Sequence, residues 1–288
     1  INKIIIAQNK IDAVSKEKAM ENYKQIKEFV KGTIAENSPI IPISAQQEIN
    51  IDKVLEELCQ IKVDNEKQDE KPCFFIARSF DINRPGKNIK ELNGGVLGGS
   101  LKQGILKKGD EIEIKPGYSY EKQNKTEYQT VITKIVSMQK GDYKVSKAGP
   151  GGSIAIETEL DPCLTKSDSL SGCVASVKGN MPEITDIIKI KFNLFKEVFG
   201  TGKHEQVEKI KPTELLMLSV NTSTTIGKVD KVKITNQDKE AEKNPFVKEQ
   251  GEVELSLKIP VIPLKKEPIG IARNIQGHWR LIGYGEII

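Results

Sequence analysis

Hydrophobic residues follow a helical spacing in the first part of the chain and a strand-like spacing in the rest. Continuous apolar runs at residues 4–7 and 39–43 have the length of fully buried strands. Between them, apolar residues recur every three or four positions over 19–34, after Ser15, which is suited to cap a helix. A second helix of this kind begins near Ile51. Alternating strands and helices predict an α/β layer here.

A highly charged stretch at residues 62–71 is typical of a linker. Beyond it, apolar and polar residues alternate, as in 110–114, where the isoleucines are expected to face a core and the acidic residues solvent. Pro116-Gly117 and other glycine-rich turn signals recur, and the polar stretches at 118–128 and 236–250 are expected to be loops. Short strands with frequent turns predict β-barrels. The predicted domains are residues 1–70, 71–182 and 183–288.

The composition fits a folded protein of the cytoplasm that makes no contact with membranes. Hydrophobic residues make up 37% and the net charge is +4, which permits contact with nucleic acid without requiring it. No apolar run is long enough to span a bilayer, and no secretory signal is present. The four cysteines form no C-x-x-C pair and are expected to be buried thiols rather than zinc ligands. Because Ile1 opens directly into an apolar run, we expect the sequence to begin inside a domain.

A first candidate site follows the first predicted strand, where the sequence reads Asn9-Lys10-Ile11-Asp12. A carboxylate such as Asp12 can accept both hydrogen bonds that guanine donates from N1 and N2, and adenine lacks that pair of donors. The Asn9 amide can bond to the N7 and O6 edge and brace the neighbouring loops, and the aliphatic part of Lys10 can cover the base. Open α/β sheets bind ligands at the carboxyl ends of their strands, where this motif falls.

A second motif, Ser44-Ala45-Gln46, stands at the same place after the second predicted strand. A small residue there lets its backbone N–H approach guanine O6, which would reinforce the choice against adenine. Each motif alone also suits an ordinary strand end that runs into a polar helix cap. Two matches, one helix apart and each at the end of a buried strand, favour a site for the guanine base.

The elements that hold phosphates in GTPases are missing from this sequence. It contains no G-x-x-x-x-G-K-[S/T] loop and no D-x-x-G acid. The nearest match has Glu197 in place of the first glycine and His204 in place of the hydroxyl residue. The glycines at 94–99 and 149–152 are expected to serve turns and close backbone approach. We therefore expect no catalytic residue, no GTP hydrolysis, no bound nucleotide and no metal site in this chain alone.

Over nearly its whole length, the sequence resembles the gamma subunits of eukaryotic translation initiation factor 2. The Asn-Lys-x-Asp motif is common to most GTPases, whereas the glycine-rich and His-Trp-Arg segments are far more specific to this family. The resemblance is carried by Gln8 to Asp12, Gly32 to Glu36, Pro39 to Gln46, Arg78 to Asn83, Gly94 to Ser100, Lys147 to Ser153 and His278 to Gly283.

This resemblance implies a fold, a cofactor and partners. The fold would be an α/β remnant of a P-loop GTPase domain followed by two all-β barrels, similar to domains II and III of elongation factor Tu. The full-length protein would bind GTP or GDP with magnesium, hydrolyse GTP, and carry initiator methionyl-tRNA to the small ribosomal subunit. Its expected partners are the alpha and beta subunits of the same factor, with alpha on the first barrel, a GTPase-activating protein and an exchange factor.

The resemblance also places the aminoacylated end of the tRNA against the first barrel, where the matching turn contains Lys147, Gly151 and Gly152. Glycines would let an adenosine approach the backbone, although an ordinary barrel turn explains the same residues. Two other readings stay open. One is another elongation factor Tu-like GTPase, such as a selenocysteine-specific elongation factor or a sulfate-activation GTPase subunit. The other is a pair of protein-binding barrels with no nucleotide role. For Trp279, contact with tRNA or a partner stays open, but a lone tryptophan near the last strands of a barrel is more often a core residue, and we expect it there.

Overall fold

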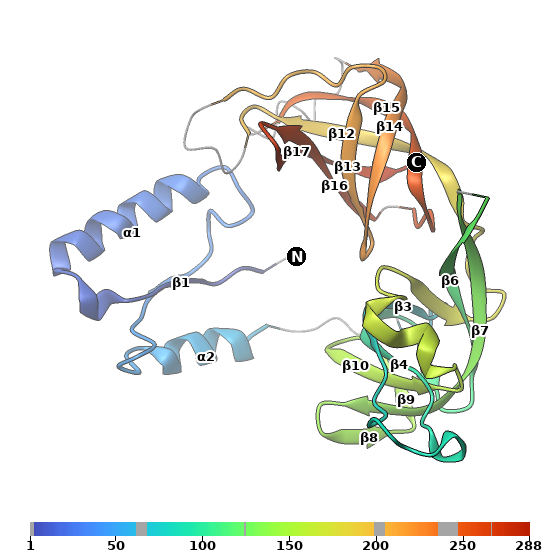
Figure 1. Cartoon of the computed structure of the whole chain (residues 1–288). Coiled ribbons are helices and arrows are strands. Elements are labelled where there is room, and N and C mark those ends of the chain that lie inside the picture. Colours follow the sequence, from blue (N-terminus) through green and yellow to red (C-terminus); the bar gives the residue numbers. More distant parts are fainter. Residues whose placement is uncertain (1–2, 62–67, 124, 199–204, 236–246, 266) are drawn as a thin grey trace. The chain divides into compact units, whose positions relative to one another are not determined.

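The computed structural model describes residues 3–61, 68–123, 125–198, 205–235, 247–265 and 267–288 (Figure 1). Among these, the residues up to Ile61 belong to one compact unit and those from Gln68 onward to a second. None of the described helices is both long and apolar enough to cross a membrane.

The first unit is a short parallel sheet with two α-helices. Its elements are β1 (Ile6–Gln8), η1 (Ile11–Ala13), α1 (Lys16–Val30), β2 (Ile40–Pro42) and α2 (Ile51–Cys59). β1 and β2 pair in parallel, and α1 connects them, as the alternating pattern predicts. The helix begins at the expected place because the Ser15 side chain accepts a hydrogen bond from the Lys18 backbone N–H.

The strands and helices of this unit are less buried than their apolar sequences predict. Ala7 in β1 is exposed, and residues 4–6 are only half-buried. On α2, Leu55 and Leu58 are 56% and 48% exposed, and Ile34 lies beyond the end of α1 with 77% of its surface exposed. The described sheet has only two strands, so it offers little area against which apolar helix faces can pack.

We expect the backbone amides of this unit to exchange with solvent faster than those of the barrel strands described below. Each strand of the sheet has a single described neighbour, and sheets of this size are marginally stable in water. Hydrogen-exchange mass spectrometry should show deuterium uptake in β1 and β2 well before the barrels. A repeat at strong dilution tests whether self-association protects the exposed faces, and equal protection of both units after dilution would contradict the expectation.

The second unit begins with a β-sheet that closes into a barrel. Its elements are β3 (Cys73–Phe80), η2 (Ile89–Glu91), β4 (Val96–Gln103), β5 (Leu106–Lys107), β6 (Glu111–Lys122), β7 (Lys125–Lys140), β8 (Tyr143–Val145), β9 (Lys147–Ala148), β10 (Ser153–Thr158), η3 (Pro162–Asp168) and β11 (Val174–Val177). The main sheet runs β10-β4-β3-β11-β6-β7-β8, and a further pairing of β10 with β7 closes a six-stranded barrel. Phe74, Ile76 and Leu97 are fully buried in its core.

Two expectations for the first barrel are wrong. Within the expected loop at 118–128, residues 118–122 and 125–128 are paired strand that extends β6 and β7, and residue 124 lies outside the described residues. Pro116-Gly117, expected to be a turn, lies within β6 where the register shifts. A Cβ atom at Gly117 would lie 2.0 Å from the carbonyl oxygen of Gln129, so the close approach of β7 admits only glycine there.

A third expectation for the first barrel is also wrong. The acidic residues of 110–114 were expected to face solvent, but Glu113 on β6 does not. The inward alternation is confirmed, since Ile112 and Ile114 are fully buried. Glu113, however, is only 6% exposed, and its Oε1 accepts a hydrogen bond from the Met181 backbone N–H at 3.2 Å. The connection after β11 therefore covers the outer side of β6, which the two-residue period of a single strand cannot reveal.

The second barrel closes on itself. Its strands are β12 (Thr185–Phe195), β13 (Leu215–Val220), β14 (Ser223–Ile234), β15 (Val247–Val261), β16 (Pro268–Ile275) and β17 (His278–Ile287). They pair in the order β12-β15-β14-β13-β16-β17, with β17 returning to β12. The predicted alternation is confirmed on β12, where Ile188, Ile190 and Phe192 are buried in the core.

Some residues of the second barrel differ from expectation. Gly270, whose residue type is typical of turns, lies inside β16. Trp279 is 37% exposed on β17 and is not a core residue. Within the expected loop at 236–250, residues 247–250 are strand, and residues 236–246 lie outside the described residues. The near match to a phosphate loop that ends at His204 also lies mostly outside them.

The cysteines divide into two kinds, where burial of all four was expected. Cys59 and Cys163 are exposed, whereas Cys73 and Cys173 are buried. Burial raises the pKa of the Cys173 thiol to about 11. Burial, and secondarily the nearby carboxylate of Glu267, raises the pKa of Cys73 to about 11 as well. Among the described residues, no group of histidine, cysteine or acidic side chains is arranged to hold a metal ion.

Candidate functional site

The two predicted guanine motifs lie side by side at one edge of the small sheet. Gln8, the last residue of β1, is in register with Pro42, the last residue of β2. The chain therefore leaves both strands at the same edge, with Asn9 following β1 and Ser44 following β2. The Gln8 side-chain amide donates to the Ala19 carbonyl oxygen at 2.8 Å, which fastens this edge to α1.

The Asn9 side chain connects the two motifs directly. Its Oδ1 accepts the backbone N–H of Ala45 at 3.1 Å and that of Lys10 at 2.7 Å. Lys10 has a φ of 65°, so the backbone turns sharply after β1 and runs into η1, which contains Asp12. Ser44 is 1% exposed and exchanges two backbone hydrogen bonds with Ile49. The amide of Asn9 thus holds the two loops in a fixed relation.

This arrangement changes the role expected for Ala45. Ala45 is one of the small residues whose backbone N–H could approach guanine O6, and in this structure that N–H donates to Asn9 Oδ1. Lys10, Asp12, Ala45 and Gln46 are all exposed, so the edge presents a carboxylate, an aliphatic lysine stem and a primary amide to solvent. These groups suit the hydrogen-bonding edge and flat face of a base, and a carboxylate repels rather than holds a phosphate.

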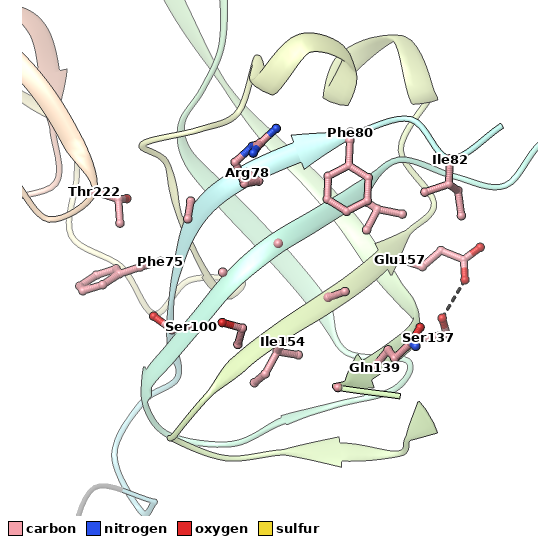
Figure 2. Close-up of a pocket in the computed structure, with 17 residues that line it drawn as sticks. Phe75, Arg78, Phe80, Ile82, Ser100, Ser137, Gln139, Ile154, Glu157 and Thr222 are labelled. Carbon is pink, nitrogen blue, oxygen red and sulfur yellow. Dashed lines mark hydrogen bonds between the residues drawn. The ribbon is translucent and has the colours of Figure 1, made fainter. Parts of the chain in front are cut away.

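A second candidate site is a pocket of about 660 Å³ on the first barrel (Figure 2). Figure 2 shows Phe80, Ile82 and Glu157 at one end of the pocket and Phe75 at the other, with Thr222 of the second barrel beyond it. The polar groups include Ser137, whose hydroxyl donates to the Glu157 carboxylate at 2.7 Å. The pocket therefore combines aromatic faces with a few hydrogen-bonding groups, as small-molecule sites commonly do.

Gly98 and Gly99 of β4 line the pocket, and Gly94 lies just before this strand. The space available for a side chain differs among these three glycines. A Cβ atom at Gly99 would lie 1.9 Å from the carbonyl oxygen of Phe75, so the close approach of β3 admits no side chain. At Gly94 the corresponding distance, to the carbonyl oxygen of Thr158, is 1.7 Å. At Gly98 a Cβ would only touch the Phe80 ring at 3.5 Å, an ordinary contact. The expected close backbone approach is thus confirmed at Gly94 and Gly99.

An ion pair fixes the cationic group beside this pocket. The Nε of Arg78 donates to Asp168 Oδ1 at 2.8 Å, and the Ser79 backbone N–H donates to the same oxygen at 3.0 Å. The hydrogen bond from Arg78, followed by that from Ser79, lowers the pKa of Asp168 below its ordinary value, so this carboxylate stays ionised near neutral pH. The Arg78 side chain remains 71% exposed, which leaves its guanidinium within reach of an anionic group.

The turn expected to face tRNA leads into the same pocket. Lys147 is exposed on β9, opposite Lys107 of β5. Gly151 and Gly152 have φ angles of 100° and 72°, a conformation that side chains other than glycine rarely adopt. A Cβ at Gly151 would meet nothing within 4 Å, so the backbone there is open to a ligand. Ser153, the next residue, lines the pocket.

The pocket walls themselves were not among the residues predicted to form a site. Arg78 and Phe80 were named only as members of the segment Arg78 to Asn83, which carries part of the family resemblance. A signal was present, because Phe80 falls on the outward side of β3 and is 37% exposed beside the exposed Arg78. An aromatic residue and an arginine together on the solvent face of a strand indicate a binding surface more often than a packing role.

Solved structures with the same architecture include two elongation factors. Elongation factor SelB from Methanococcus maripaludis aligns with 99% of this chain and 58% of its own length, with a TM-score of 0.72 and 18% identity. A bacterial selenocysteine-specific elongation factor aligns with 99% of this chain and 40% of its own, with a TM-score of 0.71 and 20% identity. The chain therefore shares the fold of the matching parts of these two elongation factors.

Sequence comparison then defines the family. The family model "Initiation factor eIF2 gamma, C terminal" matches residues 186–287. Translation initiation factor 2 subunit gamma from Methanococcus maripaludis is 47% identical over all of this chain and 67% of its own length. The corresponding subunit from Pyrococcus horikoshii is 46% identical over 99% of this chain and 66% of its own. The chain belongs to the gamma-subunit family of translation initiation factor 2 and spans about two thirds of these relatives.

Proposed function

We propose that this chain is part of a subunit that carries initiator methionyl-tRNA to the small ribosomal subunit in a GTP-dependent manner. The observation that carries the proposal is 47% identity over the whole chain to a translation initiation factor 2 gamma subunit. The selenocysteine-specific factors, a competing interpretation, share only 18–20% identity and support the fold alone. The alpha and beta subunits of the same factor, a GTPase-activating protein and an exchange factor would be its partners in the cytoplasm.

Within this function, we assign residues 1–70 to the GTPase domain, 71–182 to barrel domain II and 183–288 to barrel domain III. The edge formed by Asn9, Lys10, Asp12 and the segment Ser44-Ala45-Gln46 would hold the guanine base of GTP or GDP. Asp12 would accept the two guanine N–H groups, and Asn9 would keep both loops in place. Phosphates and magnesium would be bound by parts of the GTPase domain that this sequence does not contain.

The pocket of the first barrel would take the aminoacylated end of the tRNA. The terminal adenosine offers a flat face that can stack on aromatic rings such as Phe80, and a phosphate that can approach the guanidinium of Arg78. The glycines of the turn, Gly151 and Gly152, would allow close approach of the ribose to the backbone, and Lys147 would add a phosphate contact. The pocket and the turn are contiguous through Ser153, which supports one continuous binding surface.

Replacing Gly151 by valine in a full-length gamma subunit with GTP and magnesium bound is expected to weaken initiator-tRNA binding by about tenfold. The side chain would occupy the open space beside the backbone, two residues before Ser153 of the pocket, and loss of one stacked base alone is worth ~1–3 kcal/mol. Affinity is measured by filter binding or fluorescence anisotropy across a salt series. Lys147→Ala should lower affinity less and reduce the salt slope by about 1.

Gly179→Val is the matched control for this experiment. Gly179 also belongs to the first barrel, has a φ of 81°, and has open space at its Cβ position, but it does not line the pocket. Both variants therefore carry the same backbone strain, and only one is predicted to obstruct tRNA. Equal tRNA affinity in the two folded variants would remove the 147–153 turn from the binding surface.

A further inference from the structure

A group of lysines at one end of the first barrel is used only in part by the function proposed above. Its members lie on β5, β8 and β9 and in the turns next to them. Only Ser146 separates β8 from β9, and Figure 1 shows both strands at the same end of the barrel. The Lys108 backbone N–H donates to the Ser146 carbonyl oxygen at 2.9 Å, which joins β5 to this end. We call the group the lysine cluster, and it consists of Lys107, Lys108, Lys140, Lys144 and Lys147.

All five residues of the lysine cluster are exposed, and their charges are not neutralised. None of the five ammonium groups forms an ion pair or a hydrogen bond with a group in the part of the chain that the structure describes. Lys107 and Lys147 stand directly opposite each other in the register of β5 and β9, where two like charges repel. The same strands and turns carry two carboxylates, Asp110 and Asp142, and Asp110 already accepts the Lys107 backbone N–H at 2.8 Å. A positive excess therefore remains at this end of the barrel.

The lysine cluster adjoins the pocket of the first barrel. Gln139 and Gly141, on either side of Lys140, both line that pocket. Lys144 stands opposite Gln139 in the register of β7 and β8, so the two side chains share one side of the sheet. The Cε atom of Lys140 lies 3.3 Å from the position that a Cβ would take at Gly152, so this side chain reaches the glycine turn. The cluster and the pocket are thus parts of one surface.

An exposed aromatic ring accompanies these lysines. Tyr143 is 78% exposed and stands opposite Lys140 across the β7–β8 turn. Lysines that follow a phosphate backbone, with aromatic rings between them, are typical of surfaces that bind nucleic acid. The cluster contains no arginine, the residue whose planar fork matches a carboxylate best, and lysine binds phosphate as a point charge. These features favour a phosphate backbone over an acidic protein surface.

We propose that the lysine cluster binds the phosphate backbone of an RNA, outside the pocket that takes the tRNA end. A phosphate beside Lys107 and Lys147 would relieve their mutual repulsion, and each phosphate that a lysine neutralises releases counter-ions. The inference rests on the proposed function for RNA as the class of ligand. It adds that RNA contacts extend beyond the terminal adenosine to the far side of the glycine turn. The stem of the bound tRNA and the RNA of the small ribosomal subunit present the same chemistry, and the experiments distinguish them.

The direct test uses the full chain and a short, blunt-ended RNA hairpin labelled with fluorescein. Such a hairpin has no single-stranded end to enter the pocket, so its binding reports on the backbone contacts alone. Fluorescence anisotropy across a series of salt concentrations gives the slope of log affinity against log salt. We expect a slope of about −4, because each contact with a duplex phosphate contributes about −0.9.

The double variant Lys107→Gln, Lys108→Gln removes two cations that are not part of the proposed site for the tRNA end. It should weaken hairpin binding by at least ~10-fold near physiological salt and make the salt slope shallower by about 2. The matched control is Lys228→Gln, Lys258→Gln, which removes two exposed lysines of the second barrel that also form no ion pair with described residues. The control should bind the hairpin as the unchanged chain does. Circular dichroism shows that each variant is folded.

The same two double variants in a full-length gamma subunit that contains this chain, with GTP and magnesium bound, identify the RNA. A lower affinity for initiator tRNA in Lys107→Gln, Lys108→Gln assigns the phosphates to the tRNA. A lower affinity for small ribosomal subunits without tRNA assigns them to ribosomal RNA. Either loss, with the control variant unchanged, supports the proposal.

Several results would overturn the proposal. An equal loss of hairpin binding in the control variant would show that only the overall charge of the chain matters. Tighter binding of polyglutamate than of the hairpin would indicate an acidic protein as the partner. Unchanged affinity for both tRNA and ribosomal subunits in the full-length Lys107→Gln, Lys108→Gln variant would leave the cluster without a role in RNA binding. Because the hairpin does not enter the pocket, none of its results tests the site for the tRNA end, which the Gly151→Val experiment examines separately.

Discussion

Gly99→Ala is expected to destabilise the first barrel by at least ~3 kcal/mol. The added Cβ would lie 1.9 Å from the Phe75 carbonyl oxygen and 3.1 Å from the Phe74 ring, and a backbone atom cannot move aside as a flexible side chain can. Relief of the overlap requires β3 and β4 to separate where Ile76 stands opposite Gly99. Since a whole domain is typically stable by only about 5–15 kcal/mol, a change of this size is a large part of the total.

The matched control is the neighbouring substitution, Gly98→Ala. Its Cβ would lie 3.5 Å from the Phe80 ring, which is ordinary van der Waals contact, so stability should change by less than about 1 kcal/mol. Hydrogen exchange in peptides from the buried strands of the first barrel measures the difference in opening free energy under identical conditions. If the two variants were equally stable, the close approach of β3 and β4 would not be what requires a glycine at position 99.

Arg273→Met is expected to destabilise the second barrel by ~3 kcal/mol. Arg273 on β16 pairs with Glu214 through two nitrogens, and the two side chains are only 15% and 18% exposed. The same guanidinium donates to the carbonyl oxygens of Glu208 and Lys209, at 2.9 Å and 3.1 Å. Methionine preserves much of the volume but leaves a poorly solvated carboxylate and two carbonyl groups without a donor, and that loss of partners causes the destabilisation.

The only tryptophan of the chain, Trp279, makes this effect measurable, because it reports specifically on β17 next to β16. Urea unfolding followed by its fluorescence should show the midpoint of the second barrel shifted down in Arg273→Met. Lys211→Met is the control, since the side chains of Lys211 and Glu208 are 69% and 72% exposed and solvent screens their attraction. Adding Glu214→Gln to Arg273→Met should recover part of the loss, because it removes the stranded charge. An equally large fall of the urea midpoint in Lys211→Met would contradict the role of the buried Arg273–Glu214 pair.

Much of the fold could be predicted from local sequence patterns. The helix cap at Ser15, the parallel strands around Asn9 and Ser44, and the alternation of Ile188, Ile190 and Phe192 depend on interactions within a few residues or on one apolar face. Such features can be predicted from the residue types and their spacing along the chain. The guanine motifs were found in the same way, because each directly follows a strand.

The wrong predictions concern residues whose secondary structure or burial depends on a segment far away in the sequence. The stretch 118–128 is polar and was expected to be a loop, but backbone hydrogen bonds between β6 and β7 pair residues 118–122 with 125–129 as strands, whatever the polarity of their side chains. Glu113 is buried because the connection at Met181 covers it, and Trp279 is half-exposed because no described element covers the outer face of β17 at that point. Coverage of a strand's outer side is a property of the whole chain, so no periodicity within the strand can report it.

The sequence by itself determined the order of an α/β segment and two β-rich segments, the two base-recognition motifs, and the resemblance that the family comparison bears out. Only the tertiary structure decided that the Asn9 side chain binds the Ala45 backbone N–H, and that Arg78 and Phe80 share a pocket with Glu157. Motifs and periodicity come from neighbours along the chain. Pockets and buried hydrogen bonds come from strands brought together by closure of the barrels, and the residues involved are far apart in sequence.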